Sequence, residues 1–106
     1  MSSKNTQAVL RDFIAQREWS QFHSPENLIK SISIESGELL ECVQWGAEAD
    51  PVRIREELAD VLTYAYLLAD QMGWNPEDLI LNKLQTTREK YPVEKSKGKS
   101  TKYDQL

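Results

Sequence analysis

The chain has 106 residues, of which 28% are charged and 40% are hydrophobic, and this composition predicts one globular domain with an adequate core. The formal net charge is −4, and residues 92–106 carry four lysines against two acids, so the rest of the chain is more acidic than the total. An acidic body argues against binding to the phosphate backbone of duplex nucleic acid.

The first two predicted helices are separated by a short aromatic segment. Apolar residues at helical spacing predict a helix from about Gln7 to Arg17. The segment 19–23, Trp-Ser-Gln-Phe-His, interrupts that pattern. Ser24 followed by Pro25 is a strong helix start, and we expect the second helix to run from Pro25 to about Trp45.

The same signal of a capping residue followed by proline begins two more helices. One starts at Asp50–Pro51 and is expected to end at Gly73, which suits a helix C-terminus. The other starts at Asn75–Pro76 and is closed by Tyr91–Pro92, because proline restricts the residue before it. Residues 92–106 form a basic tail that is rich in lysine and serine, which we expect to be mobile on its own.

Together these elements predict an all-α fold, a four-helix bundle in a single domain over residues 1–106, with the second and third helices at its centre. The third helix has no charged residue from Val61 to Ala69, and its apolar residues go round the whole helix. A helix of this kind is buried on all sides, and four short helices barely supply enough cover. We therefore expect a homo-oligomer in which a partner subunit completes the burial, although helices one and four of one chain are the alternative cover.

Two acid pairs occupy the two central helices. Glu35 and Glu38 are three residues apart, as are Glu57 and Asp60, so each pair projects from nearly one helix face. Glu35 interrupts the apolar stripe of its helix, where a charge is costly unless it is compensated. Two acid pairs that face each other across a helix packing repel, and a divalent cation is the simplest compensation.

The third helix carries its acids beside an arc of apolar residues that we expect to be buried: Ile54, Leu58, Val61, Ala65, Leu68 and Met72. Glu57 and Asp60 lie at the edge of this arc, and Tyr64 follows one turn beyond Asp60. Ligation by carboxylates alone suits hard cations such as Mg²⁺ or Mn²⁺. The single histidine, His23, does not follow a glutamate by three residues, which argues against a di-iron site.

These acids and their spacing resemble a known family. Gly37–Glu41, which reads GELLE, followed by Glu57–Asp60, which reads ELAD, resembles the all-α nucleoside triphosphate pyrophosphohydrolases of the MazG-like group. Their pattern is Glu-Glu-x-x-Glu, a gap, and then Glu-x-x-Asp. Ile34 stands where many members have the first acid, and Thr87 stands where relatives often carry asparagine near the substrate.

The similarity extends over most of the chain. Residues 17–23, REWSQFH, and residues 44–45, QW, look like the dCTP pyrophosphatase branch in particular. The same is true of Lys83, of Arg88 with the Tyr-Pro that follows, and of residues 100–103, STKY. The resemblance implies a magnesium-dependent attack of water on the α-phosphorus, with release of a nucleoside monophosphate and pyrophosphate. Such an activity serves nucleotide-pool house-cleaning, and the relatives are dimers or pairs of dimers.

The candidate site residues follow from the acids and from this resemblance. The expected metal ligands are Glu35, Glu38, Glu57 and Asp60, for Mg²⁺ with Mn²⁺ as a possible substitute. Glu38 and Glu41 are the expected catalytic residues, with Glu41 binding a second ion or orienting the attacking water. The expected substrate-binding residues are Trp19, His23, Trp45, Tyr64, Lys83, Arg88 and Lys102.

Each of these residues also has a plainer interpretation. Acids three residues apart are common on solvated helix faces, tryptophans at helix ends are usually packed, and exposed lysines are usually only hydrated. Two other functions remain open: a hydrolase of the same superfamily that prefers another nucleotide such as dUTP, and a non-enzymatic helical interaction module with a structural metal site. A panel of nucleotides with product identification separates them.

The expected location is the cytoplasm. Cys42 is the only cysteine, so it cannot form an internal disulfide, which fits a reducing compartment. Residues 1–6 are polar and do not resemble the apolar part of a secretory signal. No uncharged apolar run approaches the length of a membrane span, so no membrane partner is expected.

Overall fold

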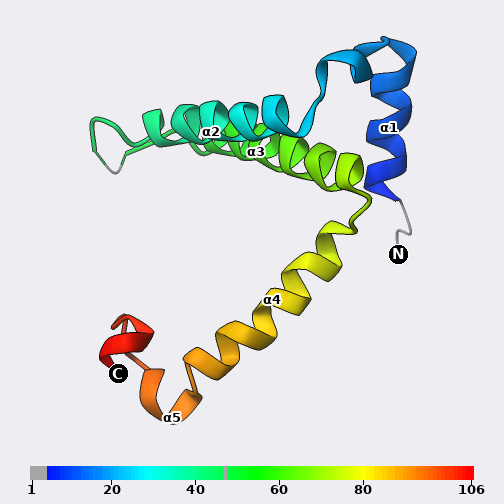
Figure 1. Ribbon diagram of the computed structural model, residues 1–106. Coiled ribbons are helices and arrows are strands. Elements are labelled where there is room, and N and C mark those ends of the chain that lie inside the picture. The colour runs from blue at the N-terminus through cyan, green and yellow to red at the C-terminus, as the bar shows by residue number, and fades with distance from the viewer. Residues whose placement is uncertain (1–4, 47) are drawn as a thin grey trace. The chain divides into compact units, whose positions relative to one another are not determined.

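The computed structural model describes residues 5–46 and 48–106, and every regular element within them is helical (Figure 1). The elements are α1 (Thr6–Gln16), η1 (Trp19–Phe22), α2 (Pro25–Glu41), α3 (Pro51–Met72), α4 (Pro76–Lys90), α5 (Val93–Ser96) and η2 (Tyr103–Gln105), where η marks a 3₁₀ helix. The predicted all-α class is confirmed for these residues. Each of the four long helices begins within one residue of its predicted start.

The starts of α2, α3 and α4 have one local cause. The side chains of Ser24, Asp50 and Asn75 each accept a hydrogen bond from a backbone N–H in the first turn of the following helix. The proline that comes next has no N–H to leave unpaired. Gly73 caps the end of α3 with a φ of 77°, a left-handed conformation that glycine adopts at little steric cost.

The end of α2 differs from the prediction. The α-helix stops at Glu41 rather than near Trp45, and tighter turns continue the chain. In these turns the N–H of Gln44 donates to the carbonyl of Glu41 at 3.2 Å, and the N–H of Gly46 donates to that of Val43 at 3.3 Å. The prediction was wrong by about one turn, because the last carbonyls of a helix often accept from three residues on instead of four.

The core of the first compact unit, which ends at Trp74, lies where α1, α2 and α3 meet. Ile14, Leu28 and Leu67 form its buried cluster, one residue from each helix. α2 packs lengthwise along α3, and α1 also contacts α3 (Figure 1). α3 is therefore the central helix of this unit.

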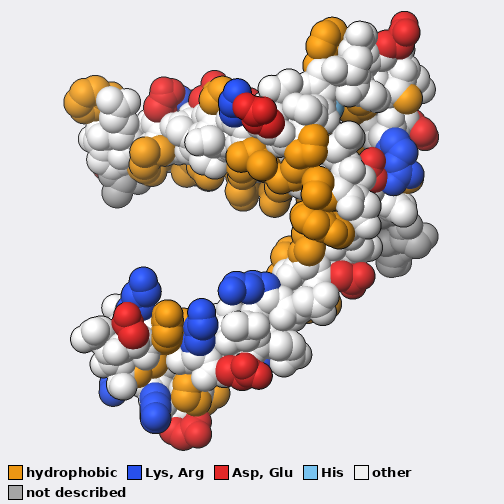
Figure 2. All heavy atoms as spheres, in the orientation of Figure 1, with side chains coloured by type: hydrophobic (Ala, Val, Ile, Leu, Met, Phe, Trp, Pro, Cys, Tyr) orange, Lys and Arg blue, Asp and Glu red, His pale blue; other side chains and the backbone are white. Residues whose placement is uncertain are grey.

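The apolar arc predicted on α3 is only partly buried. Leu58 and Met72 are 44% and 43% exposed, and the other four members of the arc are half-buried. The fully buried residues of α3, Leu67 and Ala69, lie outside the predicted arc. The prediction was wrong for Leu58 and Met72 in a single chain, because α1 has 11 residues and cannot cover the 22 residues of α3. Figure 2 shows hydrophobic side chains gathered along one side of the α2–α3 pair. Among the described helices, none has the length and apolar content of a membrane span.

Residues 75–106 form a second compact unit that contains α4, α5 and η2. Within it the ring of Tyr103 packs edge-on against that of Tyr91, with centroids 6.1 Å apart, and Lys90 Nζ lies 4.6 Å from the Tyr103 centroid. The tail thus contains two short helical segments, and its expected mobility stays a prediction. A single domain with four helices in one bundle also stays a prediction, because α4 belongs to this second unit.

Candidate active site

Three of the four predicted metal ligands converge between α2 and α3. One carboxylate oxygen from each of Glu35, Glu57 and Asp60 lies within 4.8 Å of the other two. Glu35 comes from α2, and the other two come from α3, so the cluster depends on the lengthwise packing of these helices. The spacing of three residues places Glu57 and Asp60 one turn apart on the face that meets α2.

Two oxygens of this cluster are buried without a hydrogen-bond partner among the described residues. Oε2 of Glu35 and Oε2 of Glu57 are removed from solvent, and neither has a hydrogen-bond partner within the described part of the chain. A buried carboxylate oxygen without a donor is destabilising, because it has lost its hydration and gained nothing in return. The two atoms therefore mark a place where the fold is prepared for a donor or a cation.

The fourth predicted ligand, Glu38, interacts with the same cluster. Hydrogen bonding and charge repulsion from Glu35 raise the pKa of the Glu38 carboxyl, and the charge of Glu41 adds to the effect. Burial, followed by the charge of Glu38, raises the pKa of Glu57. When two carboxylates share one site, the negative charge of one favours the protonated form of the other. The acids of α2 and α3 thus form one electrostatic unit.

The donor set fits a hard divalent cation. All of its atoms are carboxylate oxygens, which suit Mg²⁺ and Mn²⁺, and no histidine or cysteine belongs to the cluster in the described residues. Glu35, Glu57 and Asp60 would hold the cation, and the cation would supply the partner that the buried oxygens of Glu35 and Glu57 lack.

A cavity of about 250 Å³ connects this acidic cluster to aromatic side chains. Asp60 lines it together with three predicted substrate-binding residues, Trp19, His23 and Tyr64. The remaining lining residues come from α1 and α3: Leu10, Phe13, Ile14, Thr63 and Leu67. One carboxylate of the acidic cluster and several aromatic side chains therefore line the same cavity.

Trp19 is held at the edge of this cavity by neighbours in α1 and the following turn. Its ring packs edge-on against Phe13, with centroids 5.8 Å apart and an interplanar angle of 78°. The guanidinium of Arg17 lies 3.7 Å from the Phe13 centroid and donates a hydrogen bond to the Phe13 carbonyl. Glu18 adopts a left-handed backbone conformation with a φ of 54°, which turns the chain from α1 into η1. Trp19 is thus oriented before any ligand binds.

Trp45 and Glu41 are not part of that cavity. Both line another cavity of about 400 Å³, together with Cys42, Gly46, Glu48 and Arg53. Trp45 is 91% exposed. Within one chain Trp19 and Trp45 therefore belong to different cavities, and a common role at one base stays a prediction that needs a neighbouring subunit.

The predicted phosphate-binding residues lie in the second unit. Lys83 and Arg88 are exposed on α4, and Lys102 is exposed just before η2. Their role stays a prediction, because the acidic cluster belongs to the first unit. The carbonyl of Lys83 accepts a hydrogen bond from the hydroxyl of Thr87, so Thr87 is engaged with its own helix.

Several residues that line the aromatic cavity were not predicted from the sequence. Thr63 follows Asp60 by three residues, so the spacing that relates the acids also places Thr63 on their face. Leu10 and Phe13 are three residues apart on α1 and share a face in the same way. The signal was therefore present, but the packing of α1 against α3 was needed to show that these faces meet.

Comparisons with known proteins identify the family to which this chain is similar. Residues 30–106 match the MazG-like family. The chain is 37% identical over 105 residues to dCTP pyrophosphatase 1 of Rattus norvegicus and 34% identical to that of Homo sapiens. Each match covers 90% of this chain but 62% of the relative, so the chain spans less than two thirds of these mammalian proteins.

A solved structure is also similar over most of its length. The crystal structure of a pyrophosphatase from Archaeoglobus fulgidus has a TM-score of 0.74 and 38% sequence identity to this chain. The match covers 80% of this chain and 87% of the archaeal one. The resemblance in fold thus accompanies the resemblance in sequence.

Proposed function

The chain belongs to the MazG-like family, and from this membership and its acidic site we propose that it is a magnesium-dependent nucleoside triphosphate pyrophosphohydrolase. Water attacks the α-phosphorus, the bond to the oxygen that bridges the α- and β-phosphorus breaks, and a nucleoside monophosphate and pyrophosphate leave. We place dCTP first among the substrates, because relatives at 34–37% identity are named dCTP pyrophosphatase 1. The proposed role is removal of unwanted nucleotides in the cytoplasm.

One observation carries the proposal. The unpartnered buried oxygens of Glu35 and Glu57 belong to a cluster whose third member, Asp60, also lines the cavity of Trp19. A structural ion in a helical module needs ligands but no aromatic cavity beside them. The combination supports a site that binds phosphates at one end and a base at the other.

Each acid has a proposed task. Glu35, Glu57 and Asp60 hold the cation, and Glu38, whose carboxyl interacts with those of Glu35 and Glu57, joins them. A bound Mg²⁺ neutralises phosphate oxygens and makes a bound water more acidic. Glu38 is also the proposed acceptor of the water proton, because a carboxylate with a raised pKa is a stronger base than an ordinary one. Glu41, one turn further along α2, orients the water or binds a second ion.

The aromatic cavity is the proposed place of the base. Trp19 stacks on it, since an aromatic face accepts any base, and Tyr64 and His23 provide polar contacts within the same cavity. Trp45 is the proposed second stacking residue, contributed by a neighbouring subunit. Lys83, Arg88 and Lys102 are the proposed contacts to the triphosphate.

We also propose that the chain forms a homodimer or a dimer of dimers. Leu58, Leu62 and Met72 of α3 are 43–50% exposed in a single chain. Hydrophobic side chains gather along the α2–α3 pair (Figure 2), and a contiguous exposed apolar patch often marks a protein–protein interface. Light scattering at micromolar concentration is expected to give a multiple of 12.2 kDa, and the mass of one chain would refute the assembly.

A nucleotide panel tests the activity. The eight common ribo- and deoxyribonucleoside triphosphates and dUTP are incubated with Mg²⁺ or Mn²⁺, with and without excess chelator, and the products are identified by chromatography. We expect pyrophosphate and a monophosphate, with dCTP turned over fastest. A preference for dUTP would change the proposed substrate but keep the reaction. Absence of pyrophosphate from every nucleotide would refute the enzyme and favour the interaction module.

A further inference from the structure

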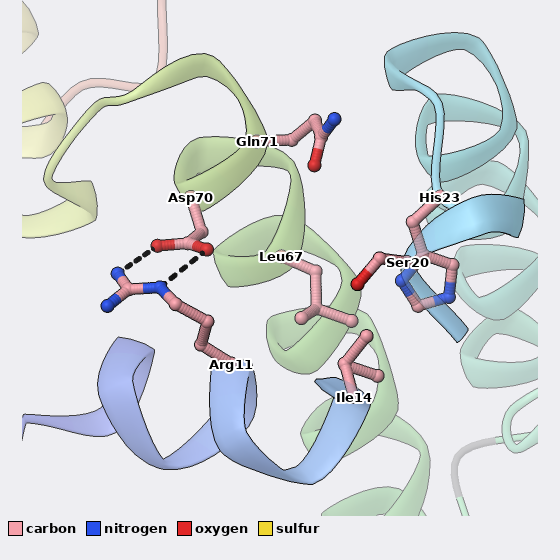
Figure 3. A pocket seen from close by; sticks show the side chains of 7 residues that line it. All are labelled: Arg11, Ile14, Ser20, His23, Leu67, Asp70 and Gln71. Atoms are coloured by element: carbon pink, nitrogen blue, oxygen red, sulfur yellow. Dashed lines mark hydrogen bonds and ion pairs between the residues drawn. The ribbon is translucent and has the colours of Figure 1, made fainter. Parts of the chain in front are cut away.

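Two polar contacts tie α1 to the far end of α3. The side-chain amide of Gln7 donates a hydrogen bond to the carbonyl of Trp74 at 2.9 Å. One turn further along, the guanidinium of Arg11 meets the carboxylate of Asp70 with two hydrogen bonds, and its Nε lies 3.1 Å from Oδ2 (Figure 3). The Asp70 side chain is largely covered, and that of Arg11 is more open to solvent.

The Arg11–Asp70 pair lies next to the aromatic cavity. It lines a small cavity of about 50 Å³ with Ser20, Gln71 and three residues that also line the aromatic cavity, Ile14, His23 and Leu67 (Figure 3). These three side chains form the partition between the two cavities. A shift of the ion pair therefore moves a wall that the aromatic cavity uses.

The walls of the aromatic cavity come from two helices that few contacts hold in register. α1 contributes Phe13 and, through the turn at its end, Trp19, whereas α3 contributes Tyr64 and Asp60. α1 has 11 residues, a length at which an isolated helix is marginal, so its position depends on what it packs against. On its buried side it offers Leu10 and Ile14 to the core, and apolar packing of this kind permits sliding.

The two parallel hydrogen bonds of Arg11 supply a directional contact, which apolar packing between α1 and α3 does not. A bidentate pair fixes the relative orientation of its partners, whereas a single contact fixes only a distance. We infer that Arg11 and Asp70 are positioning residues for the proposed nucleotide site, whose ion pair holds α1 at the place on α3 where Phe13, Trp19 and His23 form one wall. This inference rests on the proposed function for its kinetic test, but the position of Trp19 can be measured without a substrate.

A positioning role differs from a purely stabilising one in what it changes. Partly exposed ion pairs contribute little to the stability of a protein, and a bidentate pair stands at the upper end of their range, so removing this one should lower the unfolding temperature by only a few degrees. The base wall, however, contacts the nucleotide in the ground state and in the transition state alike. Loss of its alignment therefore raises KM and leaves kcat nearly unchanged.

The kinetic test is a double-mutant cycle with a matched control. Arg11→Met and Asp70→Asn each remove one partner, and the double variant removes both. Arg11→Lys keeps the positive charge but cannot form the two parallel hydrogen bonds. Lys30→Met breaks the Lys30–Glu26 pair, the other ion pair of the described residues, which is exposed on α2 and lines none of these cavities. We expect each single variant to raise KM about three- to tenfold, the double variant to be no worse than the more affected single one, and Lys30→Met to match the parent.

Fluorescence quenching measures directly how exposed Trp19 is in the wall of the aromatic cavity. In a Trp45→Phe, Trp74→Phe background Trp19 is the only tryptophan, and we expect Arg11→Met and Asp70→Asn to increase its quenching by acrylamide, with Arg11→Lys intermediate. In an active parent, values of KM for both variants that equal those of Lys30→Met would overturn the inference. If the parent hydrolyses no nucleotide, the proposed function fails, and unchanged quenching then overturns the positioning role by itself.

Discussion

Glu35 on α2 and Glu57 on α3 each turn one carboxylate oxygen into the packed space between the helices, and neither oxygen has a hydrogen-bond partner within residues 5–46 and 48–106. Asp60 completes a cluster whose oxygens lie within 4.8 Å of one another. Like charges at this separation repel, so the helices are held together here by the surrounding apolar contacts. A cation would turn this repulsion into attraction, and the first predictions follow from that reversal.

The first prediction is that Mg²⁺ stabilises the folded chain. A ligand that binds only the folded state at a hundredfold excess over its Kd stabilises it by about 2.7 kcal/mol. For a chain of this size the unfolding temperature should therefore rise by roughly 10 °C or more. Calorimetry of the chelated protein, followed by addition of Mg²⁺, measures the shift.

The control for this prediction separates the cluster from the general acidity of the chain. Glu57→Gln should abolish most of the shift, because it removes a charged ligand from the site. Glu26→Gln removes an exposed acid that pairs with Lys30 on the same helix as Glu35, and it should retain the full shift. An equal response of both variants to Mg²⁺ would show that the ion binds elsewhere.

The second prediction concerns Glu38. Glu38→Gln keeps the shape of the side chain but removes a ligand and a proton acceptor, so kcat should fall by about 10²- to 10⁴-fold, the usual range for a lost acid or base. In chelated buffer the variant should be at least as stable as the parent, because the repulsion that raises the pKa of Glu38 is gone. Steady-state kinetics and thermal unfolding are measured on the same preparation, and a kcat close to the parental value would exclude the proposed role.

Much of the fold was predictable because its signals are local. Caps such as Asp50 with Pro51, and the glycine at position 73, act within one turn of the chain, so the sequence alone locates the ends of α3. The end of α2 was not predictable to the residue, because carbonyls in a last turn accept hydrogen bonds from three or four residues on with little difference in energy. Leu58 and Met72 were placed inside by periodicity, which shows which residues share a face but not what covers it.

The candidate site was likewise predictable only where its signals are local. The convergence of Glu35 with Glu57 and Asp60 was predictable, because one acid interrupts an apolar stripe and the others repeat its spacing. The grouping of Asp60, Tyr64 and Trp19 in one cavity depends on how α1 and η1 pack on α3, which is a contact between segments more than 40 residues apart in the chain. Pairing of Arg11 with Asp70 across 59 residues left no periodic signal at all.

The third prediction is a pH dependence of the metal-free protein. The pKa values of Glu38 and Glu57 are raised above 4.5 in the folded chain, so the folded state binds more protons than the unfolded state at pH values just above 4.5. Stability should therefore fall as the pH rises through that window and level off once both groups are ionised. The groups that set these shifts are Glu35 and Glu41 on α2 and Arg53 and Asp60 on α3.

Thermal unfolding in chelator between pH 4.5 and pH 7 measures this dependence. Glu38→Gln should flatten the profile, because it removes one shifted group and the charge that raises the pKa of Glu57. Saturating Mg²⁺ should reverse the slope, since the cation binds the ionised carboxylates. A chelated parent that becomes more stable over this range would contradict the assigned directions.

The last prediction decides where the base lies. Trp19 shares a cavity with Asp60 and is already held by Phe13, so Trp19→Ala should weaken nucleotide binding by roughly 1–3 kcal/mol, the value of one base–aromatic stack. The loss should appear in KM, because the stack exists before and during the reaction.

Trp45→Ala should have an effect of the same size only if a neighbouring subunit brings Trp45 to the same base, since in one chain it lines a different cavity. Measured on an assembled and on a dissociated sample, Trp45→Ala then has two distinguishable outcomes. A KM effect that disappears on dissociation places Trp45 in a shared site, whereas an unchanged KM in the assembly, with Trp19→Ala impaired, leaves Trp19 as the single stacking tryptophan.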